Sequence, residues 1–254
     1  REEIPLDDRK TFDLLATGET TGMFQLESAG MRRYVKELRP DRVEDVMAMV
    51  ALFRPGPMDW IPTYIRRKRG QEPITYDHPA LEPVLKATYG VMVYQEDVMA
   101  VTQALAGFSL AEADVLCYTV RKKIREKLDA QKTKFMAGAH KNGVPMDVIE
   151  RVWANFEPFA RYGFNRAHAA IYGMIAYHTA YLKANYTPEY MTAVLSSEMG
   201  TPERVAIAIA ECRRMGIAVQ PPDINASDLG FDVEGTTIRF GLGAVKNAGE
   251  AAVE

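Results

Sequence analysis

The strongest local concentration of charge in the sequence is a run of basic side chains between Arg121 and Lys127. From Arg121 to Lys141 there are eight lysines and arginines against two acidic residues, in a chain whose net charge is -3. Clustered cations of this kind bind phosphate, on a nucleoside triphosphate or on a nucleic-acid backbone. The alternative is a solvated helix face that needs no ligand. A second basic patch, residues 66–69, is predicted to lie at a helix C-terminus, where cations complement the helix dipole.

A second candidate for anion binding is the segment Tyr162–Ala170. Asn165 is a good N-cap, which places Arg166 and His168 in the first turn of a helix, where free backbone N–H groups already favour an anion. Two basic side chains near the positive end of the helix dipole are unfavourable unless an anion binds there. The alternative is that His168 is a satisfied core histidine. The helix that follows is apolar nearly all round, so we expect it to be buried.

Two cysteines, Cys117 and Cys212, lie 95 positions apart without metal-ligand spacing. This pattern argues against a disulfide framework and against a structural zinc site, and it fits a reducing, cytoplasmic setting. Cys117 follows the helix signal at Ser109 and precedes the basic run. A basic environment would lower the pKa of its thiol, but its apolar neighbours favour a buried helix cysteine.

No catalytic centre can be assembled from the sequence. It contains no phosphate-binding loop of the Gly-x-x-x-x-Gly-Lys-Ser/Thr type, no dinucleotide fingerprint, no Gly-x-Ser-x-Gly and no His-Glu-x-x-His. It also lacks an Asp-x-Asp pair that could seat two metal ions. We therefore expect no catalytic residue and no metal ligand in this chain.

The elements that must position these residues are mostly helices. Asp41 with Glu44, and Ser109 with Glu112, form capping boxes ahead of apolar periodicity, and the turn at Arg54-Pro55-Gly56-Pro57 cannot continue a helix. Further helices are predicted over about 29–38, 60–69, 79–88, 94–106, 124–142, 145–161, 166–185, 188–198, 202–215 and 248–254. From Ile217 the pattern changes to a small β-hairpin, with strands around 231–233 and 236–240. The fold class is therefore mainly α.

Composition excludes several classes of protein. The 254 residues are 47% hydrophobic and 26% charged, as in a folded protein with a sizeable core, and no apolar run is long enough to span a bilayer. Disordered, collagen-like and membrane-spanning chains are excluded. The chain starts at Arg1 without an initiator Met and stops within a predicted helix, so we expect it to be a piece of a longer protein.

Five segments, taken together and in order, resemble the bacterial replicative DNA polymerase III alpha subunits, which are C-family DNA polymerases. The segments are Gly22–Ser28, Ala51–Met58, Tyr89–Glu96, Tyr162–Ala169 and Ile238–Lys246. The stretch corresponds to the fingers domain running into the start of a helix-hairpin-helix region. The resemblance implies helical fingers over 1–216, and a short β element with the start of that region over 217–254.

The resemblance implies that the parent protein is a DNA-directed DNA polymerase, a nucleotidyltransferase of DNA replication. The fingers would contact the incoming deoxynucleoside triphosphate and primer-template DNA. The family's catalytic aspartates and Gly-Ser loop belong to the palm, so Mg²⁺ would bind outside this chain. Other replicase subunits, including the sliding clamp, would also bind outside it. The chain alone is expected to be inactive.

The charge pattern and the resemblance together give the candidate site residues, although Arg121 occupies the position of a glycine in the family. Nucleotide or phosphate contacts fall on Arg121, Lys122, Lys123, Asn165, Arg166 and His168, and further DNA or nucleotide contacts on Arg54, Arg125 and Lys127. The family reads Leu-Arg-Arg-Ala-Met-Gly-Lys-Lys where this chain places Cys117 and Tyr118 over the arginine pair. A thiol and a phenol do not replace an arginine fork.

The alternative function is a non-catalytic helical module that binds nucleic acid or a partner protein. Such a module would hold DNA by itself, with a steep dependence on salt. A polymerase subdomain would instead need a neighbouring palm.

Arg121 lies one helical turn from Cys117, so its guanidinium could replace the lost arginine pair. We predict that Arg121→Ala in the full-length enzyme raises the KM for nucleotide or lowers kcat, with less effect on DNA affinity. Steady-state kinetics checks this, and an unchanged kcat/KM would refute it.

Overall fold

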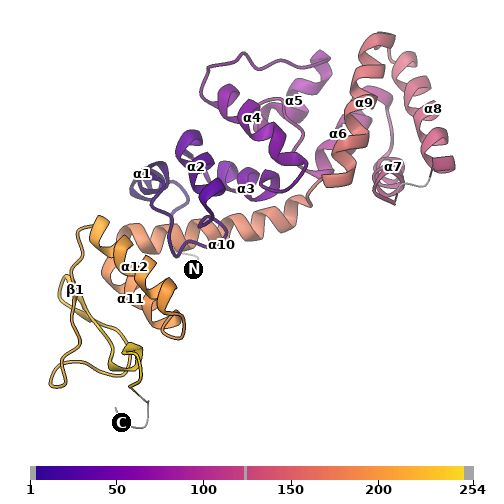
Figure 1. Ribbon diagram of the computed structural model, residues 1–254. Helices are drawn as coiled ribbons and strands as arrows, with labels where there is room; N and C mark the ends of the chain where they lie inside the picture. Colours follow the sequence, from indigo (N-terminus) through magenta and orange to yellow (C-terminus); the bar gives the residue numbers. More distant parts are fainter. Residues whose placement is uncertain (1–3, 123–124, 249–254) are drawn as a thin grey trace. The chain divides into compact units, whose positions relative to one another are not determined.

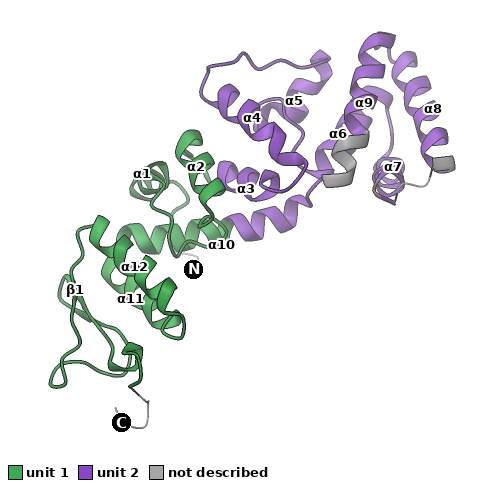
Figure 2. Ribbon diagram, in the orientation of Figure 1, with its two compact units in different colours: residues 1–43, 174–254 green, residues 44–173 purple. Residues whose placement is uncertain are grey.

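The computed structural model describes residues 4–122 and 125–248, without the side chains of Arg121, 125–126 and 157–162. Within this part of the chain helices dominate (Figure 1). The chain divides into two compact units: residues 1–43 with 174–254, and residues 44–173 (Figure 2). The helix predicted over 248–254 lies almost entirely outside the described residues. No helix of the described ranges is both long and apolar enough to cross a bilayer.

The unit of residues 1–43 and 174–254 combines helices with a small sheet. Its elements are α1 (Arg9–Thr17), α2 (Ala29–Leu38), the second half of α10 (Arg166–Asn185), α11 (Thr187–Ser197), α12 (Pro202–Arg214), β1 (Val219–Gln220), β2 (Asp232–Glu234), β3 (Thr237–Arg239) and the short 3-10 turn η4 (Leu242–Ala244). The strand order is β1-β3-β2. Strands β2 and β3 form the predicted antiparallel hairpin, with Val233 opposite Ile238, and β1 adds a parallel strand that was not predicted.

The sheet of this unit packs against α11 and α12 through one apolar core. Met191 and Leu195 of α11 and Cys212 of α12 are fully buried there together with Ile238 of β3. A sheet of three strands this short is not stable by itself, and its packing against the two helices stabilises it. Cys212 is therefore a packing residue, and burial raises the pKa of its thiol to about 11.

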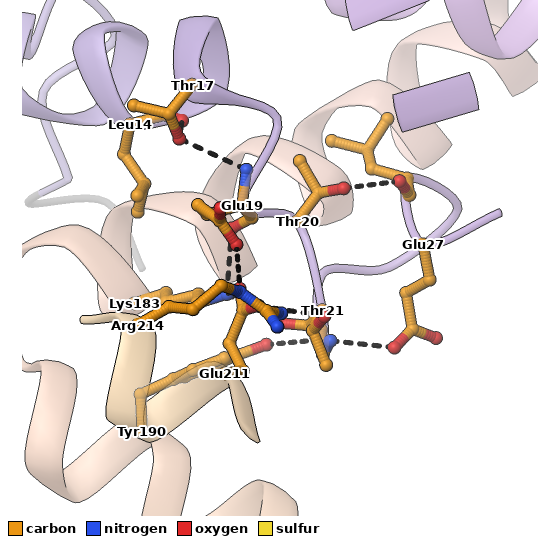
Figure 3. A network of polar contacts seen from close by, with 12 residues as sticks. Leu14, Thr17, Glu19, Thr20, Thr21, Glu27, Lys183, Tyr190, Glu211 and Arg214 are labelled. Atoms are coloured by element: carbon orange, nitrogen blue, oxygen red, sulfur yellow. Dashed lines mark hydrogen bonds and ion pairs between the residues drawn. The ribbon is translucent and has the colours of Figure 1, made fainter. Parts of the chain in front are cut away.

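A buried polar network crosses the same unit (Figure 3). The Lys183 ammonium group of α10 is fully buried, pairs with Glu211 of α12, and donates to the carbonyl oxygens of Glu19 and Thr21 at 2.8 Å each. Arg214 also pairs with Glu211, and its Nε lies 3.0 Å from Glu19 Oε2. Burial favours the neutral carboxyl, but the pairing with Lys183 and Arg214 holds the pKa of Glu211 well below its usual range. The network ties the α1–α2 loop to α10 and α12.

The unit of residues 44–173 is helical. It contains α3 (Val43–Leu52, from residue 44), η1 (Pro57–Trp60), α4 (Ile61–Lys68), η2 (Pro79–Leu81), α5 (Glu82–Leu85), η3 (Lys86–Thr88), α6 (Gln95–Ala106), α7 (Leu110–Lys122), α8 (Arg125–Lys141), α9 (Met146–Tyr162) and the first half of α10. Its core lies between α6, α7, α8 and α9. There the fully buried ring of Phe135 packs against Phe156 and Trp153, with centroids 5.3 and 5.6 Å away.

Local signals in the sequence predict the start of α7 and the turn that ends α3. The Ser109–Glu112 capping box is confirmed, because Ser109 N donates to Glu112 Oε2 at 2.8 Å and Glu112 N donates to Ser109 Oγ at 3.3 Å. The turn after α3 is also confirmed: Gly56 adopts φ +103, a conformation open to glycine. Helix α1 was not predicted, although Asp8 caps it by accepting from Thr11 N at 2.9 Å.

Two predictions about helices need correction. The helix predicted over 79–88 is broken into η2, α5 and η3, since Pro83 lacks the N–H that a continuous helix would bond to the carbonyl of residue 79. The expectation that α10 is buried all round is wrong. Its Tyr177 and Lys183 are fully buried, whereas Ile171 is 61% exposed. Apolar composition around a helix therefore did not predict burial here.

The buried pair gives a prediction for stability. We expect Lys183→Met to lower the free energy of unfolding by about 3–5 kcal/mol, because Glu211 loses the central partner of its buried charge. The double variant Lys183→Met/Glu211→Leu should be less destabilised than Lys183→Met. Urea denaturation measures both, with exposed Lys10→Met as the matched control. A cost below about 1 kcal/mol for Lys183→Met would contradict a stabilising role for the pair.

Candidate phosphate-binding site

The N-terminus of α10 has the geometry that the sequence predicted. Asn165 is its N-cap, with Oδ1 accepting from the backbone N–H of His168 at 2.9 Å. Arg166 and His168 follow in the first turn, and both side chains are exposed. The interpretation of His168 as a core histidine is therefore wrong. Its ring instead lies between those of Phe164 and Tyr172, with centroids 5.1 and 4.2 Å away.

A carboxylate from α6 already lies at this helix end. Glu96 Oε1 accepts from Asn165 Nδ2, and Glu96 Oε2 accepts from the backbone N–H of Arg166, both at 3.0 Å. The sequence pattern indicated that a negatively charged group should bind at the N-terminus of α10, but it did not identify Glu96 as that group. The two segments are about 70 residues apart, and no local signal connects them.

The start of α6 is joined to the start of α10 by backbone contacts as well. Tyr94 and Phe164 form an isolated parallel β-bridge, and Gln95 N donates to Phe164 O at 3.0 Å. The carboxylate of Asp97 accepts from the N–H groups of Val93 and Tyr94 at 2.8 Å each. The segments around 94 and 164, both noted in the sequence, therefore meet in one place.

Cation–π contacts add a third segment to this cluster. The Arg54 guanidinium lies 4.4 Å from the centroid of the Phe164 ring, and its Nε and Nη2 donate to Ala51 O. The Arg166 guanidinium lies 5.5 Å from the centroid of the Tyr94 ring. Arg54 therefore supports the end of α3 and the Phe164 ring, and Arg166 keeps exposed donors at the edge of the cluster.

Helix α7 approaches the same place through Cys117. This half-buried thiol donates to the carbonyl oxygen of Gln95 at 3.8 Å, a contact that favours a structural role for the cysteine. Lys122 and Lys127 are exposed. Lys123 and the side chains of Arg121 and Arg125 lie outside the described residues, so their predicted roles stay predictions.

Other basic residues make structural contacts. Lys134 pairs with Glu112 at 2.6 Å, and in the second basic patch Arg66 and Arg67 pair with Glu72 at 2.9 and 3.1 Å. Lys68 pairs with the fully buried Asp45 at 2.8 Å. These contacts favour the structural interpretation of residues 66–68.

The described residues do not form a metal site. Among them, no group of three or more His, Cys, Asp or Glu side chains could hold a metal ion. What the cluster offers chemically is an exposed guanidinium and an imidazole beside a helix N-terminus that Asn165 and Glu96 cap, and these two side chains suit phosphate oxygens.

Asp97 gives a pH-dependent prediction. Burial raises the pKa of this carboxyl to about 6, from 3.8 in an unfolded chain, so it contributes stability below pH 4 that is lost as the pH rises through 6. Relative to Asp97→Asn, the wild-type chain should gain about 1 kcal/mol of unfolding free energy between pH 7 and pH 5. Urea denaturation of both proteins at the two pH values checks this. The same pH dependence in both would contradict it.

Comparison with known proteins identifies the family of the chain. Residues 1–143 match the bacterial DNA polymerase III alpha subunit finger domain, and residues 216–254 match a helix-hairpin-helix motif. The DNA polymerase III subunit alpha of Thermus aquaticus is 49% identical over 99% of this chain and 21% of that protein. Those of Chlamydia trachomatis and Aquifex aeolicus are 49% and 47% identical, over 99% and 98% of this chain and 20% and 22% of those proteins.

The chain spans about a fifth of the length of these relatives. The family match includes the Arg54 turn and the start of α6, and the alignment with the Thermus aquaticus protein also covers α10. The mainly helical fold with a small sheet leading into a helix-hairpin-helix region is confirmed. The chain belongs to the bacterial DNA polymerase III alpha subunit finger domain family.

Proposed function

We propose that this chain is the fingers part of a DNA-directed DNA polymerase and that its α10 N-terminus contacts the triphosphate of the incoming deoxynucleotide. Family membership supports the reaction class. The observation that carries the contact is the pair of exposed basic side chains, Arg166 and His168, on a helix N-terminus that three separate segments hold in place. The N–H groups of Arg166 and His168 are already bonded to Glu96 and Asn165, so the donors that this helix end offers to phosphate oxygens are the two side chains.

Each residue then has a distinct role. The Arg166 guanidinium supplies paired donors for phosphate oxygens, and the His168 imidazole supplies a further donor. Asn165 shapes the helix start, since its amide is engaged by the His168 N–H and by Glu96. Positioning and charge stabilisation are what a fingers domain contributes to phosphoryl transfer.

The end of α7 forms the second part of the proposal. Arg121, Lys122 and Lys123 would hold the same triphosphate, and Arg125 and Lys127 would contact DNA or nucleotide. The exposure of Lys122 and Lys127 supports this. Arg54 contacts Ala51 and Phe164, so we assign it to support of the cluster.

Metal and partners lie mainly beyond this chain in the proposal. Mg²⁺ would neutralise charge on the reacting phosphates, and in the proposal its carboxylate ligands belong to the palm, as the family resemblance implies. Primer-template DNA would also meet the region of 217–254, which the helix-hairpin-helix match supports. Sliding clamp and other replicase subunits would bind elsewhere, in a cytoplasmic enzyme.

The test is Arg166→Ala in the full-length polymerase. Loss of a charge-assisted contact should raise the KM for deoxynucleotide about tenfold or more, with a smaller change in affinity for primer-template DNA. Steady-state kinetics and DNA titration measure the two effects.

The matched control is Arg69→Ala, at an exposed arginine of the same unit. It should leave the KM within about twofold. If Arg166→Ala weakened DNA binding and left the nucleotide KM unchanged, the alternative of a nucleic-acid-binding module would be favoured.

A further inference from the structure

Glu96 is not among the residues that sequence or family comparison assigned, yet it makes two hydrogen bonds at the start of α10. Its Oε1 accepts from Asn165 Nδ2 and its Oε2 from the Arg166 backbone N–H, both at 3.0 Å. We infer that Glu96 is a positioning residue: it fixes the first turn of α10, so that Arg166 and His168 face the phosphates of the nucleotide. This inference rests on the proposed function.

The hydrogen-bond pattern fixes one orientation of the Asn165 amide. Its Oδ1 must accept from the His168 N–H, so its Nδ2 faces Glu96 as a donor. The Arg166 N–H is also a donor. The residue at position 96 must therefore supply two acceptors at once, and an ionised glutamate does so. A glutamine has one acceptor and would turn a second donor towards Asn165.

Glu96 itself is held by the packing of α6. The N-terminus of this helix is fixed by Asp97, whose carboxylate accepts from Val93 N and Tyr94 N, and by the Tyr94–Phe164 bridge. Further along α6, Val98 and Val101 are buried in the core of the unit. Glu96 thus connects a rigid helix to the first turn of α10. Since the backbone of that turn is the base of the Arg166 and His168 side chains, a shift there would move both.

The geometry allows a sharp test by exchanging donors and acceptors. In the double variant Glu96→Gln/Asn165→Asp, the amide nitrogen introduced at position 96 would donate to the carboxylate introduced at position 165. The new amide oxygen would accept from Arg166 N, and the new carboxylate would still accept from His168 N. All three bonds are restored with the charge moved from one side chain to the other, and aspartate is also a good N-cap. Either single variant places like groups against each other: two donors in Glu96→Gln, two carboxylates in Asn165→Asp.

We expect each single variant of the full-length polymerase to raise the KM for deoxynucleotide about tenfold, with less change in kcat. Without coupling, the two changes together would raise the KM about a hundredfold. The double variant should instead return to within about threefold of wild type, a coupling of about thirtyfold or more. Glu150→Gln, at an exposed glutamate of α9, is the matched control and should leave the KM unchanged. Thermal unfolding of every variant reports folding separately from the KM.

Additive effects of the two changes on KM would overturn the inference. So would a cycle in which the unfolding temperature shows coupling and the KM does not, because Glu96 would then only stabilise the fold. The Arg166→Ala variant separates the two claims. If it raises the KM and the exchange shows no coupling, positioning by Glu96 fails and the proposed function stands. If it leaves the KM unchanged, the proposed function fails.

Discussion

The first backbone N–H groups of a helix have no partner within the helix, and at α10 the capping of these groups positions the candidate site. Asn165 satisfies one of them at His168, and Glu96 satisfies another at Arg166. This capping fixes the backbone from which the exposed side chains of Arg166 and His168 extend. Tyr94 and Arg54 both contact Phe164, the residue before the Asn165 cap. The contacts of the cluster therefore meet at the start of α10.

In the other unit, a charged side chain again satisfies backbone hydrogen-bonding groups, but there the side chain is a cation and the backbone groups are carbonyl oxygens. There the donors come from the buried Lys183 ammonium group, and the acceptors are two loop carbonyls and Glu211. A buried ammonium group is costly unless it is fully paired, so the loop between α1 and α2 is restrained to the path that brings its carbonyls to Lys183. A charged side chain from a packed helix therefore fixes the first turn of α10 in one unit and the α1–α2 loop in the other.

Local features of the fold could be predicted from the sequence. Capping at Ser109 and Asn165, and the turn at Gly56, depend only on residues that are neighbours in the sequence, so the sequence is sufficient to predict them. Burial of α10 could not be predicted, because apolar residues occur on all its faces and the exposed Ile171 resembles the buried ones in type. The role of Glu96 could not be predicted either. Its partners lie about 70 residues away, and only the tertiary fold brings them within hydrogen-bond distance.

The most direct measurement is the structure of the full-length polymerase bound to primer-template DNA and a non-hydrolysable deoxynucleoside triphosphate. The proposal predicts that a donor of Arg166 lies about 3 Å from a phosphate oxygen, with the Glu96–Asn165 hydrogen bond retained. A triphosphate bound elsewhere, with Arg166 facing solvent, would contradict it.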